Sequence, residues 1–379
     1  MNISKYGVFS TLLALGALAL SLSALPGSAQ AADQKYKIYL SMSYIGNDWQ
    51  SEAKNMVTAM AKYYSDKVDL HIQVAGTNAQ KQIQQINGMV QAGADAIVVY
   101  PISPNALNAV VRNACHRGVV VMAYDSVITE PCAHNVTIDQ HEAGAKTAQW
   151  LADTLNHKGN IVMVTGVPGT SVDKARTEAA MKVFKKYPDL HVIAKPNGMW
   201  SQAVARKVLS QVVATHGWKN IDGLWMQVGC YTATSMQIQA GIADDKLRPC
   251  AGESSNGHRV QMLDPGAVKG VSDTYRPAGL KSISYGSPIY SGALALKLAL
   301  AKLDGQKKEL PHHIKLPLPL VTSDQIKLCQ TGSYKELAAG CNVFDPSRVP
   351  PGWFSDIYSE RTPEVGFQAA LNAKPEPHP

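Results

Sequence analysis

Short apolar runs alternate with longer amphipathic stretches from residue 35 to about residue 303. In the first part of this region, the apolar runs predict strands at 38–42, 71–74, 96–100 and 119–123. Between them, apolar side chains recur at helical spacing and predict helices at 48–64, 79–91 and 104–116. The strand at 96–100 is apolar at every position, which is typical of a parallel sheet covered on both faces.

A second series of the same kind follows. It predicts strands at 161–164, 191–193, 223–226, 248–251 and 268–271. It predicts helices at 142–156, 171–186, 202–214, 231–240, 260–263 and 289–303. Repeated strand–helix alternation indicates parallel sheets with helices on both faces. Two such series fit two doubly wound α/β domains better than one oversized sheet.

The alternation stops after Pro319. Residues 345–379 contain seven prolines, which indicate an extended segment that wraps over the rest of the protein. Trp353, Phe354 and Tyr358 lie in this segment, and we expect them to pack on a domain surface.

Composition narrows the class of protein. The chain has 379 residues, of which 45% are hydrophobic and 17% charged, and this excludes intrinsic disorder, a collagen and a multi-span membrane protein. The net charge of +7 is spread along the chain without a Lys/Arg run, so we expect no nucleic-acid or membrane-surface partner.

The first thirty residues have the features of a secretory signal peptide. An apolar stretch runs from Val8 to about Leu25, and Ala29-Gln30-Ala31 is a small-x-small cleavage site. We expect cleavage after Ala31 and export to the periplasm. The alternative is an uncleaved membrane anchor.

The six cysteines are then expected in an oxidising compartment. We predict three bridges between neighbours in sequence, each closing a short loop: Cys115–Cys132, Cys230–Cys250 and Cys329–Cys341. The alternative is a set of buried free thiols. No C-x-x-C pair or Cys/His cluster suggests a metal site.

Four segments resemble the type I periplasmic sugar-binding proteins, the ribose-binding-protein-like group that serves ABC importers. They are 46–49 (GNDW), 91–101 (QAGADAIVVYP), 118–126 (GVVVMAYDS) and 166–171 (GVPGTS) followed by Arg176. Their order and spacing carry the resemblance, which spans about residues 36–320. The last sixty residues exceed the minimal length of that family.

The resemblance implies two lobes joined by three chain crossings. We expect the crossings, and therefore the hinge, near Asp139, near Tyr285 and Gly286, and near Leu318. The first lobe would comprise 33–139 and 287–317, and the second 140–286 and 318–344. The extension, 345–379, is expected to pack on the second lobe.

Ligand would bind between the lobes, at the carboxyl ends of the strands. A sugar needs aromatic walls for its C–H faces, carboxylate acceptors, and Arg or amide donors for its hydroxyls. The predicted strand ends and following turns supply Asn47, Trp49, Asp125, Arg176, Trp200, Gln227 and Glu253.

Several of these residues also have a structural interpretation. Trp49 and Trp200 are also compatible with core packing, Asp125 with a turn cap, and Arg176 with a surface ion pair. The chain also departs from the family pattern at Ser126, at 228–230 and at 285–286, which leaves fewer polar groups than a ribose site uses. The ligand would then be another small polyol, or a larger or less polar molecule.

Three functions compete. The first is a monomeric solute-binding protein that passes a sugar or polyol to an ABC importer permease. The second is a ligand-sensing subunit for a sensor kinase or chemoreceptor. The third is a secreted enzyme, which the absence of G-x-S-x-G, H-E-x-x-H, P-loop and G-x-G-x-x-G motifs disfavours. We therefore expect no catalytic residues and no cofactor.

Overall fold

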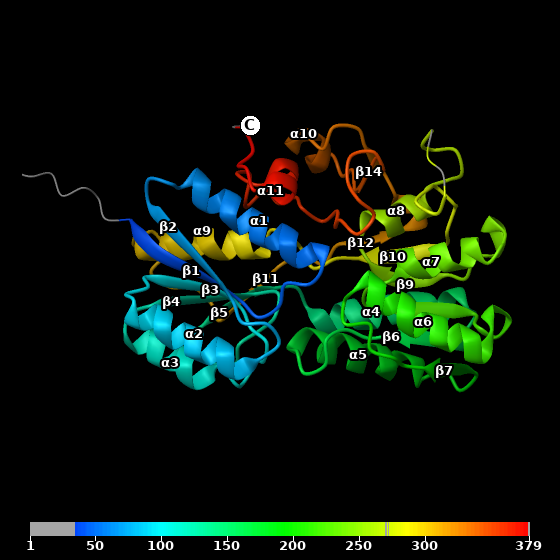
Figure 1. Cartoon of the computed structure of the whole chain (residues 1–379), viewed down its shortest axis with the longest axis horizontal. Helices are drawn as coiled ribbons and strands as arrows, with labels where there is room; N and C mark the ends of the chain where they lie inside the picture. The colour runs from blue at the N-terminus through cyan, green and yellow to red at the C-terminus, as the bar shows by residue number, and fades with distance from the viewer. Residues whose placement is uncertain (1–34, 270, 272, 378–379) are drawn as a thin grey trace, which may run out of the picture. The chain divides into compact units, whose positions relative to one another are not determined.

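A computed structural model describes residues 35–269, 271 and 273–377, whose strands form two six-stranded sheets and one short two-stranded sheet (Figure 1). The expected signal peptide lies outside the described residues. Among the residues described, no helix is both long and apolar enough to cross a membrane.

The first sheet has the order β11-β5-β4-β3-β1-β2, and all its pairings are parallel. Its strands are β1 (Tyr36–Met42), β2 (Val68–Val74), β3 (Ala96–Tyr100), β4 (Val120–Tyr124), β5 (His134–Thr137) and β11 (His313–Lys315). Four helices cover it: α1 (Asp48–Tyr63), α2 (Ala79–Gln91), α3 (Asn108–His116) and α9 (Ser291–Leu303). The first lobe is this sheet with these helices.

The second sheet has the order β12-β10-β9-β8-β6-β7, and only the β10–β12 pairing is antiparallel. Its strands are β6 (Gly159–Val164), β7 (Leu190–Ala194), β8 (Gly223–Met226), β9 (Cys250–Glu253), β10 (Ser282–Tyr285) and β12 (Leu320–Thr322). Its helices are α4 (Gln140–Thr154), α5 (Ser171–Phe184), α6 (Gln202–His216), α7 (Cys230–Gln239) and α8 (Asn256–Met262). The second lobe is this sheet with these helices.

The chain passes between the two sheets three times. The passages lie between β5 and α4, between β10 and α9, and between β11 and β12. Asp139 is in the first passage, where its side chain caps α4 by accepting from the Glu142 backbone N–H at 3.0 Å. Tyr285 and Gly286 begin the second passage, and Leu318 lies in the third.

Burial explains why the predicted strands form. Every residue of β3 and β4 is buried, because α1 and α9 pack on one face of the first sheet and α2 and α3 on the other. Most of the larger helices begin at a side chain that accepts a backbone N–H of the first turn, such as Asn47 at α1 and Thr170 at α5. These caps fix where each helix starts relative to the preceding strand end.

The strand predictions for the two large sheets differ from the structure in two ways: β5, β10, β11 and β12 were not predicted, and one predicted strand is absent from the described residues. β5 has no apolar signature because it contains His134 and Asn135, whose buried side chains are satisfied by hydrogen bonds to backbone groups. The expected strand at 268–271 does not form at its described residues. The place beside β9 that it would need is occupied by β10.

Three disulfides are present, and they are the three expected pairs. Cys115–Cys132 joins the end of α3 to the loop before β5, and Cys230–Cys250 joins the start of α7 to the start of β9. Cys329–Cys341 closes a small subdomain formed by β13 (Leu328–Cys329), α10 (Tyr334–Ala338) and β14 (Val343–Phe344).

The extension, expected to pack on the second lobe, contacts both lobes. Figure 1 shows it in orange and red beside α8 and over α1. Its helix α11 (Phe367–Asn372) packs on α1, where Asn55 Nδ2 donates to the Ala370 carbonyl at 2.9 Å. The reason is an apolar surface on α1 that the first sheet leaves uncovered and that Phe367, Ala369 and Ala370 bury. Trp353 and Phe354 are buried, as expected.

Candidate functional site

A cavity with about 420 Å³ of space between atoms lies at the carboxyl ends of strands from both sheets. Its walls come from both lobes and from the extension. They are formed by Asn47, Trp49, Gln50, Tyr100, Asp125, Val172, Arg176, Trp200, Gln227, Val228, Glu253, Tyr285, Gly286, Ser287 and Phe354. All seven residues that the sequence singled out for ligand contact are in this set. Tyr285 and Gly286, expected at the hinge, also line it.

The other two residues expected at the hinge lie elsewhere. Asp139 lines a separate cavity beside the first passage, together with Lys174 of α5 and Lys315 of β11. Leu318 packs at the edge of the hydrophobic core in the third passage.

Aromatic rings form much of the wall. Trp49 lies 6.0 Å from Tyr100 between ring centroids, and its Nε1–H donates to the Ser287 carbonyl at 2.8 Å. That hydrogen bond links α1 of the first lobe to the second passage. Trp200, Tyr285 and Phe354 complete the aromatic set. Such rings present flat, weakly negative faces, which suit the C–H face of a carbohydrate.

Arg176 is the principal cation of the site. It comes from α5 and is 6% exposed. Its Nε donates to Gln140 Oε1 at 2.8 Å and its Nη2 to Ser287 Oγ at 2.7 Å, so one guanidinium contacts residues at two of the interlobe passages. The guanidinium carbon lies 5.0 Å from the centre of the Tyr285 ring.

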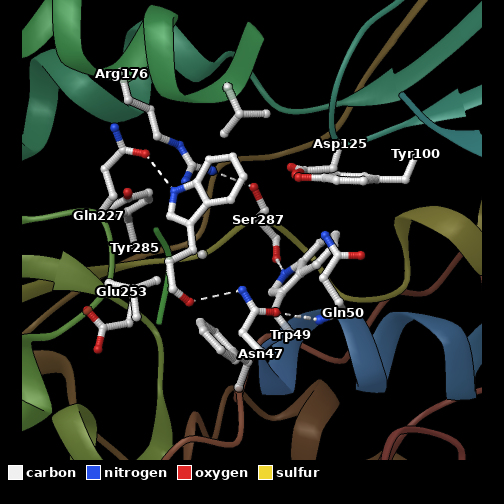
Figure 2. Close-up of a pocket in the computed structure, with 15 residues that line it drawn as sticks. Asn47, Trp49, Gln50, Tyr100, Asp125, Arg176, Gln227, Glu253, Tyr285 and Ser287 are labelled. Atoms are coloured by element: carbon white, nitrogen blue, oxygen red, sulfur yellow. Dashed lines mark hydrogen bonds between the residues drawn. The ribbon is translucent and has the colours of Figure 1, made fainter. Parts of the chain in front are cut away.

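Asp125 supplies a carboxylate from the opposite side. In Figure 2, Asp125 and Arg176 enter the cavity from the two lobes. Gln140 Nε2 donates to Asp125 Oδ1 at 3.0 Å. Burial raises the pKa of the Asp125 carboxyl above its ordinary value of 3.8, and the Arg176 charge opposes part of that rise.

The polar atoms of Asn47, Gln227 and Glu253 form hydrogen bonds to other groups of the protein. Gln227 Oε1 accepts from Trp200 Nε1 at 2.8 Å and so orients that ring. Glu253 accepts from the backbone N–H groups of residues 229 and 230 at the start of α7, and from Gln202 and Ser255. Asn47 caps α1, and its Nδ2 reaches across to the Trp200 carbonyl at 3.1 Å. These three residues hold the walls in place.

Two wall residues adopt left-handed backbone conformations. Asp125 has φ of 57° and Trp200 of 51°. This region costs an L-residue about 1–2 kcal/mol, although Asp adopts it more readily than most. The network around Gln227 and the hydrogen bonds to Asp125 hold both residues in this conformation.

Several wall residues were missed at the sequence level. Tyr100 ends β3, so the strand-end rule that identified Asp125 would also have selected it. Ser287 lies in the second passage, and Gln50 is the helical neighbour of Trp49. Gln50 Oε1 and the Tyr285 hydroxyl lie buried in the wall, and no hydrogen bond of ordinary geometry reaches either of them from the described residues. The Arg176 guanidinium lies over the Tyr285 ring and opposes part of the rise that burial causes in the pKa of its hydroxyl. Phe354 has no comparable signal, because it lies in a segment without periodicity.

Near the site, and within the described part of the chain, one group of potential metal ligands lies together. It comprises Cys230, Glu253 and His258, with ligand atoms within 4.8 Å of one another. Cys230 is already bonded to Cys250, and both ring nitrogens of His258 have hydrogen-bond partners in the core. This donor set does not fit a metal ion.

Residues 38–307 match the family model described as "Periplasmic binding protein domain". A curated relative, the xylitol-binding protein of Mycolicibacterium smegmatis, is 31% identical over 229 residues, which cover 60% of this chain and 64% of the relative. The D-xylose-binding periplasmic protein of Escherichia coli is 25% identical over 223 residues, covering 59% and 60% of the two chains. The match therefore spans less than two thirds of the length of either relative.

The fold is also found among solved structures. A periplasmic solute-binding protein of an ABC transporter from Actinobacillus succinogenes, crystallised with D-allose, superimposes with a TM-score of 0.62 at 22% identity. The superposition covers 77% of this chain and 99% of that one.

Proposed function

We propose, from the premise that this chain belongs to the periplasmic binding protein family, that it captures a neutral sugar or polyol between its two lobes. The observation that carries the proposal is that Asp125 and Arg176 line one aromatic cavity and enter it from opposite lobes. A hydroxyl both donates and accepts, so one buried acceptor and one buried donor can serve the two sides of a polyhydroxy ligand.

Two further polar atoms of the cavity wall support the same class of ligand. Gln50 Oε1 can accept from a hydroxyl, and the Tyr285 hydroxyl can donate or accept. Trp49 and Trp200 offer ring faces to the ligand's C–H groups. The xylitol-binding relative is consistent with a small polyol.

The function is capture and release without covalent chemistry. Ligand contact with both lobes would favour the closed arrangement, by bending at Asp139, at Tyr285 and Gly286, and at Leu318. We propose the lobe boundaries given from the sequence as the units that move. A monomer, exported to the periplasm by its signal peptide, would present the closed form to an ABC importer permease.

Thermal unfolding with candidate ligands tests the proposal. The purified mature protein is mixed with xylitol, D-xylose, D-ribose, D-allose and myo-inositol. A ligand at 100 times its Kd stabilises the folded state by about 2.7 kcal/mol, which raises the Tm by several degrees. Calorimetry then gives the Kd of each compound that raises it.

A pair of arginine variants locates the site. Arg176→Met is expected to abolish the ligand-induced rise in Tm, because it removes the guanidinium from the cavity. Arg112→Met is the matched control, since Arg112 is ion-paired with Glu130 on the first lobe, outside the cavity. No rise with any compound, or an equal rise in both variants, would contradict the proposed function.

A further inference from the structure

The extension forms one wall of the ligand cavity. Phe354 lines the cavity itself, and it also lines an adjoining cavity of about 490 Å³. The two cavities share Asn47, Trp200, Val228 and Phe354. The Phe354 ring therefore lies at the boundary between the space around Asp125 and Arg176 and the space beyond it.

The part of the extension next to Phe354 is bound to the second lobe. The Ser355 backbone N–H donates to the Ser254 carbonyl at 3.0 Å, directly after β9. Asp356 forms an ion pair with Arg259 of α8 at 3.0 Å, and the Arg259 side chain is fully buried. A buried ion pair of this kind fixes the position of the extension on α8, because moving either partner would leave the other charge buried and unpaired.

A buried glutamate anchors it on the first lobe. Glu52 Oε1, from α1, accepts from the Phe354 backbone N–H at 2.9 Å. Glu52 is 3% exposed, and burial raises the pKa of its carboxyl well above the ordinary value. Its second oxygen has no hydrogen-bond partner among the described residues. Burying the Glu52 carboxyl costs the folded state free energy, and its one hydrogen bond goes to the backbone N–H of Phe354, whose ring lines the ligand cavity.

Gly352, two residues before Phe354, lies beside the start of α1. A Cβ added at Gly352 would clash with the Asp48 carboxylate, so a larger residue would require that carboxylate to move. The hydrogen bond from the Phe354 backbone N–H to Glu52 holds the segment close to the first lobe.

We infer that Phe354 determines the size of ligand that the site accepts, and that Glu52 positions Phe354. This inference rests on the proposed function. With Phe354 in place, the ligand space ends at its ring. With a smaller side chain, the two cavities join, and a longer polyol can extend toward Ser201 and Gln202.

Calorimetry with xylitol and with maltitol, a polyol of disaccharide size, tests the inference. Wild type is expected to bind xylitol in preference to maltitol. Phe354→Ala is expected to weaken xylitol binding and to raise the ratio of maltitol to xylitol affinity at least tenfold. Tyr358→Ala is the control: Tyr358 lies in the same segment but packs on Tyr334, away from the cavity, and its loss should leave the ratio unchanged.

Two substitutions at Glu52 separate positioning from general stability. Glu52→Gln keeps an oxygen that can accept the Phe354 N–H, so it should retain the wild-type ratio. Glu52→Ala should shift the ratio in the direction of Phe354→Ala. If Phe354→Ala does not fold, Phe354→Leu replaces it, and a smaller shift of the same sign is expected.

The outcomes separate the two proposals. A wild-type protein that binds neither these polyols nor any compound of the thermal screen contradicts the proposed function, and the inference falls with it. A different result overturns the inference alone. In that result the wild type binds xylitol, and the Phe354→Ala and Glu52→Ala variants fold but keep the wild-type ratio of maltitol to xylitol affinity.

Discussion

Replacing Asp125 with asparagine should weaken ligand binding without weakening the fold. The substitution keeps the shape of the side chain and removes its charge. Asparagine also tolerates the left-handed backbone at this position, where φ is 57°. Its amide oxygen can still accept from Gln140 Nε2, which lies 3.0 Å from Oδ1 of the aspartate.

The size of the effect follows from the carboxylate's surroundings. A hydrogen bond to a charged group contributes about 1.5–3 kcal/mol, so losing one with the ligand should raise Kd by about 10- to 150-fold. Burial raises the pKa of Asp125, so the ionised form costs the folded state free energy at neutral pH. That cost is absent at low pH and develops as pH rises from the ordinary value of 3.8 through the raised pKa of the folded state. Without ligand, Asp125→Asn should therefore have an unchanged or higher Tm at pH 7.

Calorimetry with the best ligand of the thermal screen and thermal unfolding without ligand measure the two quantities separately. Asp66→Asn, at an exposed position outside the cavity, is the control and should change neither. Unchanged affinity would remove Asp125 from the ligand contacts. A Tm that falls together with affinity would show that the carboxylate serves the fold instead.

Three further outcomes are expected. Trp49→Phe keeps an aromatic wall but loses the indole N–H bond to the Ser287 carbonyl, so calorimetry should show a Kd raised by about 5- to 20-fold; an unchanged Kd would contradict this role. In Glu336, burial alone would raise the carboxyl pKa, but hydrogen bonds from residues 330–332 outweigh it and lower the pKa to about 2. Stability from this group is full above the ordinary value of 4.5 and is lost as pH falls through 2, so Glu336→Gln should lower the Tm at pH 7 by a few degrees and much less near pH 2; an equal loss at both pH values would refute it. Replacing Cys115 and Cys132 with alanine removes a crosslink between positions 17 residues apart and should lower the free energy of unfolding by about 3 kcal/mol. Thermal unfolding should show a Tm lower by several degrees, and an unaltered Tm would count against a stabilising role of this disulfide.

The parts of the site that the sequence predicted are those determined by strand ends. Asp125 directly follows β4, Glu253 ends β9, and Trp49 lies in the first turn of the helix after β1. Parallel strands bring such ends to one edge of a sheet. Their positions therefore follow from local pattern plus topology. The division of roles among them does not, because it depends on contacts over long sequence distances. Gln227 orients Trp200 from 27 residues away, and this pairing leaves no trace in either local pattern.

The contribution of the extension could not be predicted for a related reason. Prolines correctly indicated an irregular segment, but its path depends on matching surfaces far away in sequence. Glu52 and Phe354 are 302 residues apart, and nothing near Glu52 distinguishes it from a solvent-facing helix glutamate. Similarly, β5 pairs in the sheet although His134 and Asn135 give it no apolar run.

The path of the extension bears on how the protein is made. The last strand of the two large sheets ends at Thr322, so both sheets are encoded before Phe354 is translated. A polypeptide interrupted between these points would carry every strand of its lobes but an unfinished pocket. Under the proposed function, tight ligand capture would then distinguish finished molecules from prematurely terminated ones.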